Sequence, residues 1–156
     1  MRNIFLASLV LSIGLSSCGG GGDASSTSSD TVKEKPQSML KKEVDPMMDK
    51  GVGPITEVTL APEIDQEMAA RGAETYQKMC TACHKPTERF IGPAPKGVLD
   101  RRSPEWVMNM ILNPDQMVKE NAQAKKLLME YNGSPMANQN LTEEQAREVL
   151  EYFRTL

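Results

Sequence analysis

The stretch MCTACHKP, residues 79–86, constrains this chain more than any other, because it gathers thiols and an imidazole in one turn. Two of the three cysteines, Cys80 and Cys83, stand three positions apart, and His84, the only histidine, follows directly. Side chains of these types serve as a thiol redox pair, as zinc ligands, or as the attachment point of a haem. The rest of the chain has to distinguish these three uses.

The chemistry of each use decides between them. Structural zinc needs four ligands and catalytic zinc three, and His84 adjoins Cys83 too closely for joint chelation. A thioredoxin-like pair belongs in a βαβ setting, whereas the residues before Met79 have a helical pattern. Cys-x-x-Cys-His is the attachment signature of haem c. We therefore predict one haem c, covalently bound through Cys80 and Cys83 with His84 on the iron; thiol chemistry is the alternative.

The N-terminus has the pattern of an export signal. Arg2 precedes an apolar run, residues 4–15, that is shorter than the roughly 20 residues of a membrane-spanning helix. The run leads into Ser16-Ser17-Cys18 and a Gly/Ser tract, which resembles a bacterial lipobox. We expect residues 1–17 to be a lipoprotein signal peptide and lipidated Cys18 to anchor the protein on the periplasmic or other extracytoplasmic face of a membrane. An ordinary secretory signal is the alternative.

Composition divides the remaining chain into three segments. Residues 18–50 are rich in Gly, Ser and mixed charge, which predicts a flexible tether. Residues 51–65 are more apolar and are expected to form an extended arm lying against the domain. Residues 66–156 form the predicted folded domain. The chain carries 18 Lys and Arg against 21 Asp and Glu without a basic cluster, which excludes a typical nucleic-acid binder.

The domain is predicted to be all-α, with four short helices and long loops. The helical patterns cover residues 65–79, 103–114, 122–131 and 141–156. Ser103 is placed as an N-cap with a proline at the first helical position, and Asn113-Pro114 as the end of that helix. Thr142 and Gln145 have the spacing of a capping box. No segment alternates as a strand does.

These features together resemble the class I monohaem cytochromes c. Residues 72–80, with the pattern G-x-x-x-Y-x-x-x-C, resemble the first helix of that family, and Ile91-Gly92-Pro93 resembles the stretch after its haem motif. The resemblance implies the cytochrome c fold around one covalent haem, and electron transfer in place of catalysis. It also implies that the Pro93 carbonyl accepts a hydrogen bond from His84.

The second axial ligand of the iron must come from another residue type, because His84 is the only histidine. Methionine, lysine, water and a foreign ligand remain. Met136 stands 52 residues beyond His84 in a predicted loop, which can deliver a side chain without breaking helical hydrogen bonds. The family's distal methionine lies in such a loop before its last helix. We therefore expect Met136, with Met117 in a predicted turn as the alternative; Met/His ligation raises the reduction potential.

Two further predictions concern the surroundings of the haem. Trp106 is expected to contact it and to donate its N–H to a propionate, with a plain core position as the alternative. Lys78, Lys85 and Arg89 flank the attachment site and are expected to form an ordinary solvated rim, with a docking patch near the haem edge as the alternative.

A six-coordinate haem predicts a one-electron carrier and no enzyme activity. The chain is similar to lipoprotein cytochromes that accompany respiratory reductases, notably nitrous-oxide reductase systems. That similarity implies redox protein partners: a bc-type or alternative complex as donor, and nitrous-oxide reductase or a terminal oxidase as acceptor. The alternative is a haem enzyme or gas-binding sensor with an open distal site; a peroxidase is disfavoured because the chain has no second histidine.

Overall fold

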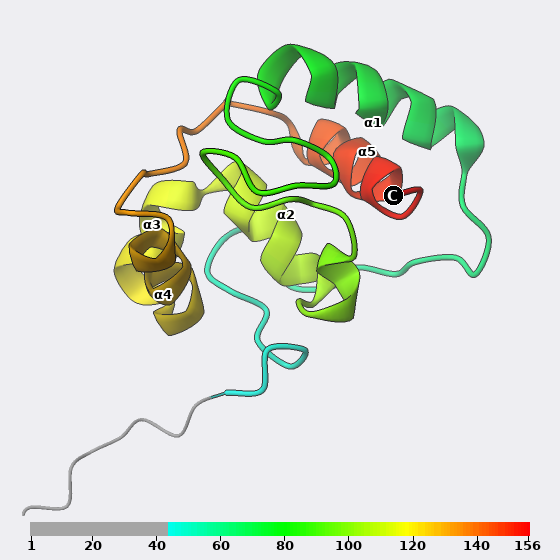
Figure 1. Ribbon diagram of the computed structural model, residues 1–156. Helices are drawn as coiled ribbons and strands as arrows, with labels where there is room; N and C mark the ends of the chain where they lie inside the picture. The colour runs from blue at the N-terminus through cyan, green and yellow to red at the C-terminus, as the bar shows by residue number, and fades with distance from the viewer. Residues whose placement is uncertain (1–43) are drawn as a thin grey trace, which may run out of the picture. The chain divides into compact units, whose positions relative to one another are not determined.

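The computed structural model describes residues 44–156, and the regular structure within that range is entirely helical (Figure 1). The predicted signal peptide, Cys18 and residues 18–43 of the predicted tether lie outside the described residues. The elements are α1 (Gln66–Met79), the 3-10 turn η1 (Val98–Asp100), α2 (Pro104–Leu112), α3 (Pro114–Glu120), α4 (Ala122–Glu130) and α5 (Glu143–Phe153). The all-α prediction is confirmed. No helix among these residues is long and apolar enough to cross a membrane.

The helix starts follow from local side-chain chemistry. The Ser103 hydroxyl accepts a hydrogen bond from the Trp106 N–H at the start of α2, 3.1 Å away. At α5, Thr142 Oγ1 accepts from the Gln145 N–H and Gln145 Oε1 accepts from the Thr142 N–H, at 3.2 and 3.0 Å. Both predicted caps are therefore confirmed. They satisfy backbone donors that a helix leaves unpaired at its first turn.

Helix α3 was not predicted. The sequence pattern places Asn113-Pro114 at the end of one helix, whereas Pro114 opens the next one, directly after the cap Asn113. Proline is well suited to the first helical position, because its missing N–H would have no partner there and its φ is already helical. The same residue thus terminates α2 and starts α3, so Met117 lies in a helix and not in a turn.

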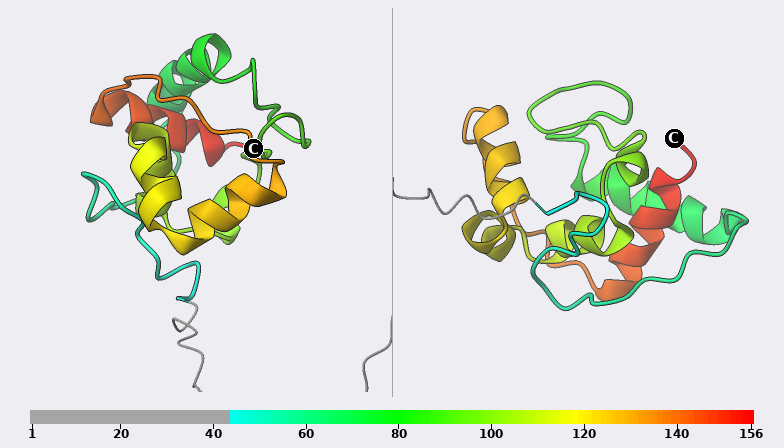
Figure 2. Two further views of the ribbon diagram at one scale, coloured as in Figure 1. Left: turned by 90° about the vertical axis from the view of Figure 1, so that its left-hand side faces the viewer. Right: turned by 90° about the horizontal axis from the view of Figure 1, so that it is seen from below.

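Helices α1 and α5 cross each other closely (Figures 1 and 2). A Cβ at Gly72 would collide with the Glu148 carbonyl of α5 and would lie 2.9 Å from the Val149 nitrogen. Next to this crossing, Tyr76 packs on Tyr152 and Phe153 with ring centroids 5.3 and 5.8 Å away. The glycine allows the two backbones to meet, and the aromatic rings fill the space beside them.

One hydrophobic core joins α2, α3, α4 and α5. Its buried members are Trp106, Val107, Met108, Ile111, Met117, Ala124, Ala146, Val149 and Leu150. The last three lie on the apolar stripe of α5. Some of its members, including Ile111 and Val149, share a cavity with Cys80.

Residues 51–65 form neither helix nor strand, and they are bound to α2 by buried polar side chains. Asn109, 1% exposed, donates from Nδ2 to the carbonyls of Lys50 and Ile55 at 2.9 and 2.8 Å, and its Oδ1 accepts from the Ile55 N–H at 3.0 Å. Four apolar side chains of this segment pack on the core: Val52, Ile55, Val58 and Leu60. Asn109 therefore binds both backbone carbonyls and a backbone N–H group of the segment that lies against α2.

The contacts of the arm extend back into the segment predicted as tether. The Asp49 carboxylate accepts two hydrogen bonds from Asn121 Nδ2, at 2.9 and 2.8 Å, and the Asp49 carbonyl accepts one from Ser103 Oγ at 2.6 Å. Residues 45–49 form a turn, closed by the Met48 and Asp49 N–H groups on the Asp45 carbonyl. The structure thus differs from the sequence expectation at residues 45–50, because the caps of α2 and α4 supply partners that composition does not reveal.

Candidate functional site

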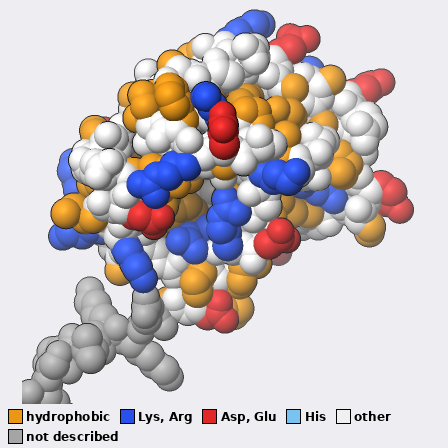
Figure 3. All heavy atoms as spheres, viewed as in Figure 1, with side chains coloured by type: hydrophobic (Ala, Val, Ile, Leu, Met, Phe, Trp, Pro, Cys, Tyr) orange, Lys and Arg blue, Asp and Glu red, His pale blue; other side chains and the backbone are white. Residues whose placement is uncertain are grey.

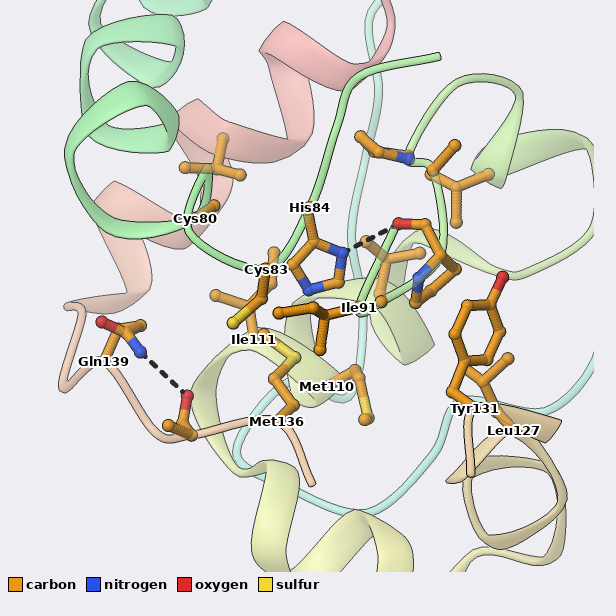
Figure 4. A pocket seen from close by; sticks show the side chains of 18 of the residues that line it. Cys80, Cys83, His84, Ile91, Met110, Ile111, Leu127, Tyr131, Met136 and Gln139 are labelled. Carbon is orange, nitrogen blue, oxygen red and sulfur yellow. Dashed lines mark hydrogen bonds between the residues drawn. The ribbon is translucent and has the colours of Figure 1, made fainter. Parts of the chain in front are cut away.

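A largely apolar cavity of about 240 Å³ lies among the end of α1, the loop after it, α2, α4 and the loop between α4 and α5. Cys80, Cys83 and His84 line it from the loop after α1, and Met136 lines it from the α4–α5 loop. Figure 4 shows the His84 ring and the Met136 side chain directed into the same space from these two segments. The structure therefore brings the predicted attachment and ligand residues to one cavity.

The end of α1 places the two thiols and the imidazole together. The Cys80 N–H bonds to the Tyr76 carbonyl as the last helical link, and the Cys80 carbonyl then accepts from the N–H groups of Cys83 and His84 at 3.0 and 2.9 Å. Cys80 and Cys83 form no disulfide with each other. Burial, assisted by the neighbouring Cys83, raises the pKa of the Cys80 thiol to about 11. For Cys80, this direction is opposite to the lowered pKa of a reactive redox thiol.

The loop after the cysteines holds the His84 ring in one orientation. His84 Nδ1 donates to the Pro93 carbonyl at 2.8 Å, the hydrogen bond expected from the resemblance. A donor at Nδ1 leaves Nε2 with its lone pair free, which is the form that binds a metal. Gly92 lies against the ring: a Cβ there would collide with Cε1 and lie 2.8 Å from Nδ1. The Gly92 N–H also bonds to the Cys83 carbonyl at 2.8 Å, which closes the loop over the imidazole.

The methionines of the domain differ in whether they line the cavity. Met136 lines the cavity from an irregular loop, and Met79 and Met110 line it from α1 and α2. Met117 lies outside the cavity lining: it is 0% exposed, and its sulfur accepts the Val52 N–H at 3.0 Å. Its place in α3 explains this, since the helix directs it into the core.

Trp106 lines the cavity, but its N–H does not face it as predicted. The indole Nε1 donates to Asn121 Oδ1 at 3.2 Å, and that oxygen also accepts the Ala124 N–H at 2.9 Å as the N-cap of α4. Asp49 holds the other end of the Asn121 amide. The predicted donation to a propionate is therefore corrected: Trp106 supplies an apolar wall, and its polar atom is used to join α2 to α4. The sequence contains one indication of this role for Asn121: it directly precedes a helical pattern, where an N-cap residue is expected.

Basic side chains gather around a hollow on one face of the molecule, with carboxylates among them (Figure 3). The three cations of the predicted solvated rim, for which a docking patch is the alternative, each have an acidic neighbour. Lys78 lies 3.8 Å from Glu74, Lys85 lies 2.8 Å from Glu88, and Arg89 lies 3.7 Å from Glu130. These pairs are exposed and individually weak. The structure thus gives the patch less free positive charge than the sequence suggests.

Comparison with known proteins identifies the family. A sequence model of the family described as cytochrome c matches residues 69–156, more than half of the chain. The chain belongs to the cytochrome c family. Among solved structures, the cytochrome is similar to a cytochrome c from Rhodothermus marinus, at 45% identity and a TM-score of 0.64, over 66% of this chain and 88% of that chain.

Engineered forms of that protein match this cytochrome as well. One, bound to a carbene intermediate (1-ethoxy-1-oxopropan-2-ylidene), is 44% identical with a TM-score of 0.61, over 66% of this chain and 88% of that chain. A second engineered form is 44% identical with a TM-score of 0.63, over 66% of this chain and 89% of that chain. Among curated proteins, none matches this chain.

Membership of this family implies covalently bound haem c, and the residues of the cavity fit it. Two thiols stand three positions apart on one turn, an imidazole with a free Nε2 follows, and the walls are mainly apolar. Gly92 leaves the ring of His84 the space it needs. The cytochrome therefore carries haem c through Cys80 and Cys83 and functions in haem-based electron transfer, as the sequence predicts.

Proposed function

We propose that this cytochrome is a membrane-tethered one-electron carrier whose iron is bound by His84 and Met136. The observation that carries the proposal is that these two side chains line one apolar cavity from different segments, with the His84 ring already oriented by Pro93. Met117, the alternative ligand, is occupied with the arm in the core. A haem with both axial positions filled by protein leaves no place for a substrate.

The haem supplies the exchange of one electron between ferric and ferrous iron. The protein residues do the remaining work. The Pro93 carbonyl accepts the Nδ1–H of His84, which would leave Nε2 available to the iron. Apolar walls such as Trp106, Ile111 and Val149 keep water from the site. The soft thioether of Met136 favours the ferrous state and raises the potential.

The tether and the partners form the second part of the proposal. Lipid chains on Cys18 would hold the mature protein at the extracytoplasmic or periplasmic face of a membrane, and the Gly/Ser-rich segment would let the domain reach its partners. The resemblance to lipoprotein cytochromes of respiratory chains supports a bc-type or alternative complex as donor. It supports nitrous-oxide reductase, or a terminal oxidase, as acceptor.

Absorption spectra of the purified holo-cytochrome test the proposed iron site. The expected result is a haem c spectrum with the weak sulfur-to-iron charge-transfer band in the ferric form, and no change when carbon monoxide is added to the ferrous form. Immediate binding of carbon monoxide would reject the closed carrier in favour of a haem enzyme or gas-binding sensor. A haem c spectrum without the band would reject Met136 as the ligand.

The Cys18→Ala variant tests the anchor. We expect it to lose all membrane association and to be recovered with the soluble extracytoplasmic proteins, because no other lipid attachment is proposed. Membrane fractionation followed by haem staining measures this. The Cys18→Ala protein must still carry haem, since Cys80 and Cys83 are unchanged. Retention of the variant in the membrane fraction would contradict the lipid anchor and leave the iron site untouched.

A further inference from the structure

Beyond its first turn, the loop that carries Met136 makes few hydrogen bonds to the rest of the domain, although Met136 itself packs against the core. It leaves α4 through a tight turn in which Asn132 and Gly133 have φ values of 58° and 72°. The side chains along residues 132–140 are mostly exposed, while Met136 itself is half-buried. Beyond the turn, Asn138 Nδ2 donates to the Leu112 carbonyl at 3.2 Å. Its first residues are held to the end of α4 by backbone hydrogen bonds, among them the Gly133 N–H to the Leu128 carbonyl at 2.9 Å. The position of the loop therefore follows the position of this end of α4.

Arg89 makes three contacts at that first point. Its Nη2 donates to the Glu130 carbonyl at 2.7 Å, and its Nη1 lies 3.7 Å from Glu130 Oε1. Its guanidinium carbon stands 4.0 Å from the centre of the Tyr131 ring, in the geometry of a cation–π contact. A cation on the last carbonyls of α4 also matches the negative end of the helix dipole. One side chain therefore fixes the last residue of α4 and the first residue of the loop.

The position of Arg89 in the chain gives these contacts their significance. Arg89 belongs to the loop that runs from His84 to its hydrogen-bond partner Pro93. Tyr131 lines the cavity and begins the segment that leads to Met136 (Figure 4). The Arg89 contacts therefore join the loop on the His84 side of the cavity to the loop on the Met136 side, across 41 residues of sequence.

We propose that Arg89 is a positioning residue that keeps the Met136 loop closed on the iron. This inference rests on the proposed ligation by Met136. While Arg89 holds Glu130 and Tyr131, the start of the loop stays against the cavity and Met136 stays within reach of the iron. Without these contacts the loop opens more often, and a foreign ligand competes more successfully for the sixth position.

Imidazole binding to the full-length ferric cytochrome tests this role, because imidazole and Met136 compete for one position. The reporter is the loss of the sulfur-to-iron band during a titration. We expect Arg89→Gln to bind imidazole about tenfold more tightly than the wild type, the size expected when a cation–π contact and a charge-assisted hydrogen bond are lost. Arg89→Lys, which keeps a charge near the Tyr131 ring, is expected to lie between the two.

Lys85→Gln is the matched control. Lys85 lies on the same loop, pairs with Glu88 at 2.8 Å and stands 5.0 Å from the Phe90 ring, so it repeats the contact types of Arg89 without touching Glu130 or Tyr131. Its imidazole affinity is expected to stay within about twofold of the wild type. Equal affinities for Arg89→Gln and Lys85→Gln, with the band present in the wild type, would overturn the role of Arg89 alone. A wild type without the band would overturn Met136 ligation and this inference together.

Discussion

Gly72→Ala is expected to destabilise the holo-cytochrome by roughly 3 kcal/mol, against the trend of helix propensity. In an isolated helix, alanine is favoured over glycine by about 1 kcal/mol. In this cytochrome the added methyl group would meet the Glu148 carbonyl and lie 2.9 Å from the Val149 nitrogen, both in the backbone of α5. A backbone cannot rotate away as a side chain can, so α1 and α5 would have to separate, and overpacking of this kind commonly costs about 1–3 kcal/mol or more.

Denaturant unfolding of the haem-containing protein measures this effect as a change in midpoint at unchanged slope. The control is Ala70→Gly, two residues earlier on the exposed side of α1. This variant replaces alanine by glycine, the reverse of Gly72→Ala, at an exposed position of the same helix. It is expected to lower the free energy of unfolding by about 1 kcal/mol, because glycine has the lower helix propensity. A Gly72→Ala variant more stable than the wild type would mean that α1 and α5 do not cross at this residue.

Met136→Ala is expected to leave the haem attached and to change its absorption spectrum, its binding of carbon monoxide and its reduction potential. The thioether bonds depend on Cys80 and Cys83, so the variant keeps a haem c spectrum. The sulfur-to-iron band disappears, carbon monoxide binds the ferrous form, and the reduction potential falls by on the order of 0.1 V, since axial ligands set potentials over a range of roughly 0.8 V. Absorption spectroscopy and a redox titration measure the three changes.

Met110→Ala is the control for this experiment. Met110 also lines the cavity, but it belongs to α2, and the regular hydrogen bonds of that helix fix the position of its backbone. We expect the Met110→Ala variant to keep the sulfur-to-iron band and to lose some stability, because a half-buried methionine is truncated. If Met110→Ala lost the band and Met136→Ala kept it, the assignment of the ligand would be reversed.

Features that depend on neighbouring residues could be predicted from the sequence alone. The caps Ser103 and Thr142 act on N–H groups three positions later, so a single stretch of sequence contains both partners. The Cys80–Cys83–His84 turn is equally local, since the N–H groups of Cys83 and His84 both bond to the Cys80 carbonyl. Its chemistry, together with the resemblance that it supports, was enough to predict the fold class and the covalent haem.

Features that depend on partners far away in the chain could not be predicted in this way. The Trp106 N–H has two chemically suitable kinds of partner, a haem propionate and a polar side chain, and its sequence neighbours favour neither. The fold brings Asn121 to it, and Asn121 is itself held by Asp49, 72 residues earlier. For the same reason, the sequence assigned residues 45–50 to the tether although the structure binds them to the domain: their partners belong to the caps of α2 and α4.

The two methionine candidates illustrate the same division. Met117 and Met136 have identical chemistry, and a count of residues from His84 does not separate their reach. The helix start at Pro114 turns Met117 into the core, where the Val52 N–H binds its sulfur, whereas Met136 stays on an irregular loop beside the cavity. Residue type and local spacing thus define which side chains are able to bind the iron. Packing between distant segments then decides which of them face the cavity: it places the Met117 sulfur on the Val52 N–H in the core and leaves Met136 at the cavity.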